Sequence, residues 1–311
     1  MQDSDDEVGA VDIGDENGAT QYSAPYQEQP KSAPAVSSSS STLDPSEFLM
    51  KVATPGELVH CTVRRRKASS FFKGEDQGYE LFQMLGGKER FLASARKKKQ
   101  SKHPSYEFSL DRLQMMRPTD SVSNKFGKLK ANYMTTNFSV LSPGANPAKM
   151  SMWDDEFDRP DGVRMREELC KVDYHKPLAG LKGTSFRSIH VSIPKVDAAG
   201  ERLSKEALGS SDLHTWVLDN AHPLWNPKSK AYEMTFLNGS MKASCKNFQL
   251  LAGRVATDAA AQAALPGSDT VVLEFGKTSK EDFVLIYSWP LTGLQAFGIA
   301  LSAFNHKLAY V

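Results

Sequence analysis

The sequence predicts a β-rich domain whose sheet closes around one apolar helix, and two features of the chain indicate this. From Glu57 onward, short runs rich in β-branched and aromatic residues alternate with turn residues. The last of these runs is followed by an almost wholly apolar stretch, residues 290–304. The connections are too short for regular crossover helices, so we expect the strands to be antiparallel.

Many of the expected strands alternate apolar with polar residues, as half-buried antiparallel strands do. The expected strands are residues 58–63, 79–85, 90–95, 106–110, 138–141, 188–193, 232–237, 271–275 and 283–287. The expected helix opens near Pro290 and ends by Asn305. It is apolar almost all round, so it must be surrounded, and it is shorter than the roughly 20 residues that cross a bilayer. We therefore place it inside a closed or nearly closed barrel.

The chain ahead of the barrel is expected to have two parts. Residues 1–45 are dominated by Asp, Glu, Ser, Pro and Gln, and we expect a disordered tail. Residues 46–54 form a linker or a short docking segment, in which the apolar patch Phe48, Leu49 and Met50 either docks on the domain, the favoured interpretation, or binds a partner. Residues 55–311 form the domain. The acidic N-terminus has no secretory pattern, so the cytosol or nucleus is the expected compartment.

Length, charge and cysteine content limit the kinds of protein that this chain can be. The chain has 311 residues, and its 40% hydrophobic content is enough for a substantial core. The net charge of +1 conceals an acidic start and two basic runs, residues 64–67 and 96–99, which we expect to be exposed strand ends or loops that add to a positive field. Cys61, Cys170 and Cys245 are far apart and odd in number, so we expect reduced, buried thiols and no zinc site.

The C-terminal stretch resembles a known family. Residues 287–304 read YSWPLTGLQAFGIALSAF and are similar to the terminal "YPL-ALQAFAIALSSF" signature of the Tubby-like proteins. Further matches in the family's order are FLASARKKK at 91–99, GKLKAN at 127–132, PLWN at 223–226 and KASCKNFQ at 242–249. The resemblance covers residues 55–311 and implies a closed twelve-stranded antiparallel β-barrel around a central hydrophobic helix. No F-box precedes it, so we do not expect a ubiquitin-ligase adaptor.

The same resemblance implies a ligand, the headgroup of phosphatidylinositol 4,5-bisphosphate, bound on the outer surface of the barrel. The family's basic residues fall on Lys128, Lys130 and Arg166, and a pocket Asn falls on Ser105. Lys128 and Lys130 are two apart, so on a strand they share a face and Leu129 turns to the other. Arg166 would add a planar donor fork. Lys130 replaces a usual Arg and Ser105 a longer side chain, so we expect looser headgroup selectivity.

We therefore expect a non-enzymatic, monomeric adaptor, without cofactor or metal, at the anionic inner leaflet of the plasma membrane. Its tail would engage a protein partner in signalling or in the trafficking of membrane proteins to cilia. The main alternative is a nucleic-acid-binding transcription regulator released from membrane to nucleus, for which the basic runs offer phosphate contacts. A scramblase-like barrel is less consistent with the sequence, since such barrels end in a membrane-inserted helix and lack the KNFQ and LQAF signatures.

Enzyme motifs are missing from the sequence. It contains no GxSxG, HExxH or GxxxxGK[ST] motif, and no GxGxxG follows a strand. The acidic residues Asp154, Asp155, Glu156 and Asp158 are expected to form a solvated loop. His175 and His190 have no companion at metal-ligand spacing, and we expect both to be ordinary surface or barrel positions. We predict no catalytic residues.

Overall fold

The computed structural model describes most of the chain from residue 43 onward, and all of the described residues fall in the compact unit Ser39–Val311. These residues are 43–66, 78–98, 103–112, 125–146, 164–175, 188–197, 199–203, 214–228, 231–239, 241–244, 246–253, 255, 261, 265 and 267–305. The predicted tail, the acidic residues 154–158 and Cys245 lie outside them, apart from the last residues of the tail.

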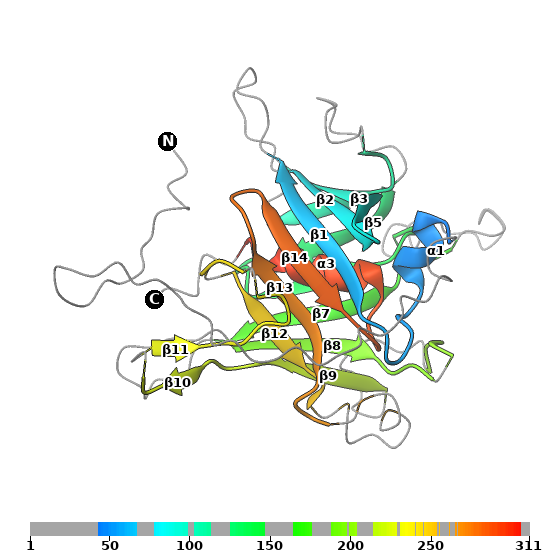
Figure 1. The fold of residues 1–311 in the computed structure, drawn as a ribbon. Coiled ribbons are helices and arrows are strands. Elements are labelled where there is room, and N and C mark those ends of the chain that lie inside the picture. The colour runs from blue at the N-terminus through cyan, green and yellow to red at the C-terminus, as the bar shows by residue number, and fades with distance from the viewer. Residues whose placement is uncertain are drawn as a thin grey trace, which may run out of the picture. The chain divides into compact units, whose positions relative to one another are not determined.

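The described residues contain a closed antiparallel barrel of twelve strands (Figure 1). In chain order its strands are β1 Val59–Arg66, β2 Gly78–Leu85, β3 Lys88–Lys97, β4 Ser105–Ser109, β5 Lys125–Ala131, β6 Asn137–Leu141, β7 Glu168–His175, β8 Ser188–Pro194, β9 Thr215–Asn220, β12 Phe248–Leu251, β13 Val271–Lys277 and β14 Asp282–Tyr287. Around the barrel the order is β1, β14, β13, β12, β9, β8, β7, β6, β5, β4, β3 and β2, and β2 pairs with β1. The predicted fold class is confirmed.

Two short strands stand apart from the barrel. They are β10 Leu224–Asn226 and β11 Ala231–Glu233, which pair with each other. The strand expected over residues 232–237 therefore ends early. The backbone N–H groups of Leu237 and Asn238 donate to the buried carboxylate of Glu274 on β13, at 2.7 and 3.2 Å. Those groups are consequently not paired in a sheet.

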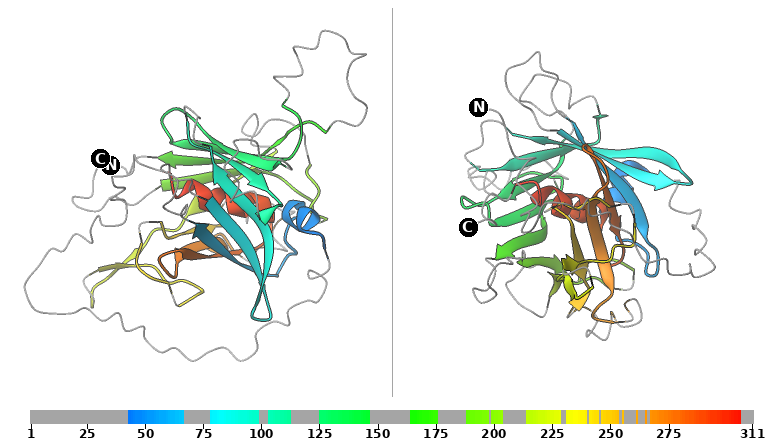
Figure 2. Two further views of the ribbon diagram at one scale, coloured as in Figure 1. Left: turned by 90° about the horizontal axis from the view of Figure 1, so that it is seen from above. Right: turned by 60° about the vertical axis from the view of Figure 1, so that its left-hand side comes forward.

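The barrel is filled by the helix α3, Gly293–Ser302, and all ten of its residues are buried. Figures 1 and 2 show it, in red, surrounded by the ring of strands. Thr292 caps its start in a reciprocal arrangement, with Thr292 Oγ1 accepting from the N–H of Gln295 and Gln295 Oε1 accepting from the N–H of Thr292. The predicted central helix is confirmed, although it begins three residues after Pro290. No helix in the described part of the chain is long and apolar enough to cross a bilayer.

A short helix ahead of the barrel, α1 Pro45–Met50, packs on the domain. Asp44 caps it, and Phe48 and Leu49 are buried. The chain then pairs with the residue before α3, through a bridge between Val52 and Thr292. The apolar patch at residues 48–50 is thus taken up largely by the domain's own core, and α1 contacts both α3 and β3.

Two of the cysteines are inside the barrel wall. Cys61 on β1 and Cys170 on β7 are free thiols and fully buried. Burial raises the pKa of both thiols, because the thiolate would lose its hydration. Neither thiol is therefore a reactive group at neutral pH.

Candidate anion-binding site

The candidate site is built on the outer face of β5. Gly127, Leu129 and Ala131 of this strand are buried, while Lys128 is half-buried and Lys130 is exposed. This alternation is the period of two of a β-strand, and it directs both lysines away from the core. The two ammonium groups therefore share one face of the barrel wall.

The neighbouring strand β4 brings Ser105 beside these lysines. Ser105 lies directly opposite Lys130 in the antiparallel pairing, and Glu107 lies opposite Lys128. The Oγ atom of Ser105 is buried and has no hydrogen-bond partner among the described residues. A buried hydroxyl without a partner is costly, so this atom calls for a polar partner that the described residues do not supply.

Arg166 reaches the site from the segment that leads into β7. Its backbone N–H donates to Ala145 O at 2.9 Å, and its Nη2 donates to Gly144 O at 3.1 Å. Gly144 has φ of +136°, and a Cβ there would lie 2.6 Å from Arg164 O, so only glycine fits. The Nε of Arg166 is buried without a hydrogen-bond partner in the described part of the chain.

Four cations converge at this place, namely Lys98, Lys128, Lys130 and Arg166, which we call the basic cluster. Burial lowers the pKa of Lys128, and the positive charges of Lys98, Arg166 and Lys130 lower it further, while Glu107 opposes them. The other three cations are therefore close enough to repel the Lys128 ammonium group. A phosphate placed among them would relieve that repulsion.

Two members of the site were not among its predicted residues, namely Glu107 and Lys98, which the sequence indicated only as part of the basic run 96–99. The backbone N–H of Lys98 donates to Ser105 O at 2.7 Å, which places Lys98 just beyond the end of β3 and beside Ser105. The buried carboxylate of Glu107 pairs with Lys125 Nζ at 3.0 Å. The signal that identifies both residues is their pairing across β3, β4 and β5, which the sequence alone does not contain.

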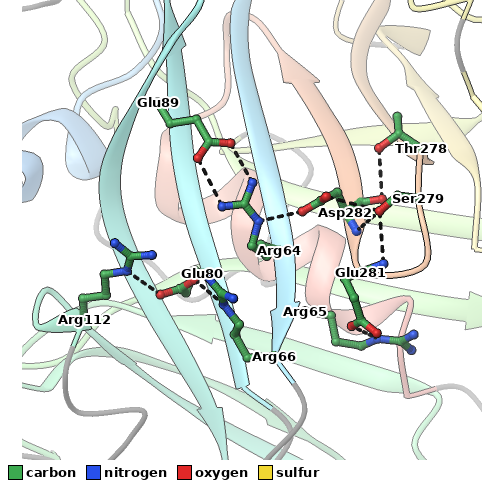
Figure 3. Close-up of polar contacts among 10 residues, drawn as sticks. All are labelled: Arg64, Arg65, Arg66, Glu80, Glu89, Arg112, Thr278, Ser279, Glu281 and Asp282. Carbon is green, nitrogen blue, oxygen red and sulfur yellow. Dashed lines mark hydrogen bonds and ion pairs between the residues drawn. The ribbon is translucent and has the colours of Figure 1, made fainter.

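The basic run that starts at Arg64 is only partly the exposed positive feature that the sequence predicted, because Arg66 is exposed at the end of β1 whereas Arg64 is half-buried and Arg65 is buried. Arg64 is in β1, where it makes two hydrogen bonds to the Glu89 carboxylate, at 2.7 and 3.1 Å (Figure 3). Its Nε also donates to Asp282 at 2.7 Å. Two acidic side chains therefore neutralise this arginine.

The other arginines of this run are held in the same way (Figure 3). Arg66 Nε and Arg112 Nε pair with the two carboxylate oxygens of Glu80, at 2.8 and 2.7 Å. Arg65 is buried, and its Nε lies 3.5 Å from Glu281. The arginines are paired because carboxylates from β2, β3 and β14 lie close to β1. Arg64, Arg65 and Arg66 therefore contribute little to a positive field, and Lys67 lies outside the described residues.

His175 and His190 are neighbours on the barrel surface. Their ring centroids are 4.7 Å apart, and His190 Nδ1 pairs with Asp219. The antiparallel pairing of β7 and β8 brings them together. Within the described ranges, however, no group of three or more His, Cys, Asp or Glu side chains has metal-binding geometry.

Comparisons with known proteins identify the relatives of this chain. The sequence model described as the Tub family matches residues 49–306. Human Tubby-related protein 1 is 32% identical over 280 residues, covering 86% of this chain and 46% of that protein. Mouse Tubby-related protein 3 is 31% identical over 279 residues (85% and 55%), and Protein king tubby of Drosophila pseudoobscura pseudoobscura is 30% identical over 280 (85% and 54%).

The chain spans about half the length of the curated relatives it matches. Neither the family model nor these relatives indicate a catalytic family. The match includes β5, the segment before β7 and the central helix α3, and it begins at Leu49 of α1. The closed barrel, its buried C-terminal helix and these sequence matches agree with the resemblance in the terminal signature, and the chain belongs to the Tub family.

Proposed function

We propose that this domain binds the headgroup of phosphatidylinositol 4,5-bisphosphate and so tethers the protein reversibly to the inner leaflet of the plasma membrane. Lys128, Lys130, Arg166 and Ser105 are the proposed contacts. The tether would serve a non-enzymatic adaptor in signalling or in the trafficking of membrane proteins to cilia. Release would follow when the lipid is hydrolysed.

One observation carries the proposal, namely that the basic cluster places three cations around the half-buried Lys128 next to donors that lack partners. Arg166 Nε and Ser105 Oγ are buried without hydrogen-bond partners among the described residues. Burial lowers the pKa of Lys128, Glu107 opposes that shift, and the charges of Lys98, Arg166 and Lys130 lower the pKa further. An anion with several oxygens satisfies both conditions, because it neutralises the charges and accepts from the donors.

The energetics favour a defined pocket over a diffuse positive surface. Three cations near an anionic leaflet gain about 1 kcal/mol each, and about 3 kcal/mol in total is weaker than millimolar binding. Hydrogen bonds to a charged group add about 1.5–3 kcal/mol each. Two or three such bonds bring the affinity into the micromolar range. Headgroup selectivity should therefore depend on the donors of Arg166 and Ser105, and binding should weaken with salt.

The test is co-sedimentation of the full chain with vesicles that carry different phosphoinositides, at physiological salt. The informative variant is Lys128→Ala/Lys130→Ala. Its matched control is Lys51→Ala/Lys88→Ala, which removes the same charge from two other exposed positions. We expect selective binding to the 4,5-bisphosphate that is lost in the first variant and kept in the control.

Two results would contradict the proposal. Unchanged binding in Lys128→Ala/Lys130→Ala would refute the site. Absence of binding to every lipid would refute the function and make nucleic acid the leading ligand. Salt-dependent duplex binding that survives loss of Lys128 and Lys130 but fails when residues 96–99 are neutralised would then support that alternative.

A further inference from the structure

The hairpin that joins β5 to β6 exposes two large side chains close to the basic cluster. Tyr133 is 84% exposed and Met134 is 62% exposed. They follow directly on the strand that carries Lys130, with Ala131 and Asn132 between. Together they form a small exposed patch at the hairpin tip.

The turn that presents them is held by one side chain, that of Asn132. Its Oδ1 accepts from the N–H groups of Thr136 and Asn137, at 2.9 and 3.2 Å. Its Nδ2 donates to Thr136 Oγ1 and Asn137 Oδ1, at 3.0 and 2.7 Å. The backbone N–H of Thr135 donates to Asn132 O at 3.2 Å. Several polar groups of the turn are thus already paired, which reduces the cost of moving the tip into a less polar medium.

The tip is also linked to the candidate site. The ring of Tyr133 makes an edge-on contact with the ring of His103, with centroids 5.5 Å apart. His103 lies two residues before Ser105, whose strand is paired with that of Lys130. Tyr133 and the basic cluster are therefore parts of one surface formed by the β4–β5 pair and the β5–β6 turn.

We propose that Tyr133 and Met134 form a wedge that enters the interfacial layer of an anionic bilayer when the basic cluster holds a lipid headgroup. The inference rests on the proposed function and adds a second membrane contact to it. Tyr133 and Met134 lie in the turn just past Ala131, the last residue of β5, so the tip projects beyond the end of the strand that carries Lys130.

The chemistry of the tip fits a bilayer better than a protein partner. An aromatic ring with a polar end is suited to the membrane–water interface, and the Met side chain is apolar and adaptable. Adjacent Lys130 supplies attraction to anionic lipid. Two side chains bury far less area than a stable protein interface requires, which is about 800 Å² per partner. A headgroup contact and a wedge together provide the two signals that stable anchoring needs.

The experiment compares membrane binding with binding of the soluble headgroup. In the full chain, Tyr133→Ser/Met134→Ser should weaken partitioning onto vesicles containing phosphatidylinositol 4,5-bisphosphate roughly tenfold. The reason is that the variant no longer gains free energy by moving two large side chains partly out of water. Its affinity for inositol 1,4,5-trisphosphate, measured by calorimetry, should not change. The control variant Leu224→Ser/Leu237→Ser alters two other exposed apolar residues, 78% and 58% exposed, and should behave as wild type in both assays.

The outcomes separate the two proposals. If wild type binds vesicles and Tyr133→Ser/Met134→Ser binds them equally well, the wedge is refuted and the headgroup site stands. If the variant loses vesicles and soluble headgroup in the same proportion, the tip acts through the site and the wedge is again refuted. If wild type binds neither vesicles nor soluble headgroup, both proposals fail.

A direct readout of insertion is an environment-sensitive fluorophore on Met134→Cys, with Cys245 replaced by Ser. Cys61 and Cys170 are buried, so the label is directed to the tip. Vesicles should shift its emission to the blue and allow quenching by lipids labelled in the upper acyl chain, whereas soluble headgroup should do neither. Unshifted emission from vesicle-bound protein would overturn the wedge.

Discussion

Replacing Gly298 by Ala in the middle of α3 tests how closely the central helix fits the barrel wall. In an exposed helix this change stabilises by about 0.5–1 kcal/mol, because Ala is the better helix former. Here a Cβ at position 298 would lie 2.3 Å from Cγ2 of Val140, a fully buried residue of β6. Carbon atoms pack at about 3.5–4.0 Å. Either the valine leaves its rotamer or the helix moves.

The net cost follows from these two opposing effects. Overpacking of this kind costs about 1–3 kcal/mol, and the gain in helix propensity offsets up to about 1 kcal/mol. We expect Gly298→Ala to lower the free energy of unfolding by about 1–2 kcal/mol, or the Tm by roughly 2–8 °C for a domain of this size. Thermal unfolding followed by circular dichroism measures the shift, and urea unfolding checks that the m-value is unchanged.

A second substitution identifies the clash. Val140→Ala removes the two methyl groups and should alone cost about 1–3 kcal/mol through lost burial and the cavity. Combined with Gly298→Ala, it should cost less than the sum of the two, because the new Cβ fills the space. A rise in Tm for Gly298→Ala, or strict additivity of the pair, would refute this packing. The contact matters for the site, since Val140 pairs with Leu129, the residue between Lys128 and Lys130.

For three further substitutions the structure predicts the direction in which stability changes. Leu49→Ala should lower the free energy of unfolding by about 2–5 kcal/mol in urea, because the side chain is fully buried, and a loss under 1 kcal/mol would show that α1 is dispensable. Thr292→Ala should cost about 1 kcal/mol by removing one half of the capping box, while Thr292→Ser should restore it. Lys128→Met should raise the Tm at pH 7 while weakening phosphoinositide binding. Burial lowers the pKa of Lys128 from its ordinary 10.5, so the unfolded chain holds the proton more tightly and wild type regains stability as pH rises from the lowered pKa towards 10.5. The gain in Tm from Lys128→Met should accordingly shrink over that pH range, and a gain independent of pH would contradict the charge argument.

Most strands of the barrel could be predicted from the sequence, whereas β7, β9 and β12 are not among the expected runs. In β7, Glu168, Lys171 and Asp173 occupy outward or half-exposed positions, and only Cys170 and Val172 are fully buried. In β7 only the inward-facing residues are apolar, and they are too few to distinguish a strand from a loop by sequence. The four residues of β12 present the same difficulty, because a central strand of that length has almost no period to detect.

Some features of the candidate site could likewise be predicted from the sequence, and others could not. The shared face of Lys128 and Lys130 follows from their spacing, and β5 presents both on the outside. The pairing of Ser105 with Lys130 depends on a shift of register between Phe108 and Ser109, and no local pattern specifies that shift. The neutralisation of Arg64 was equally inaccessible, since Asp282 lies 218 residues away in the chain. Long-range pairing decides which charges are free.

The basic cluster can persist in the free protein only because the barrel wall that carries it is rigid. Lys98, Lys130 and Arg166 repel Lys128, and a flexible surface would let these charges move apart. The closed sheet fixes Lys128 and Lys130 from behind through Leu129, which is fully buried, while backbone contacts to Gly144 and Ala145 fix Arg166. The free protein thus retains a repulsion that a bound phosphate removes, and that difference adds to the binding free energy. A more neutral surface at this place would stabilise the fold and bind anions less tightly, which is why the stability and the ligand affinity of Lys128→Met should change in opposite directions.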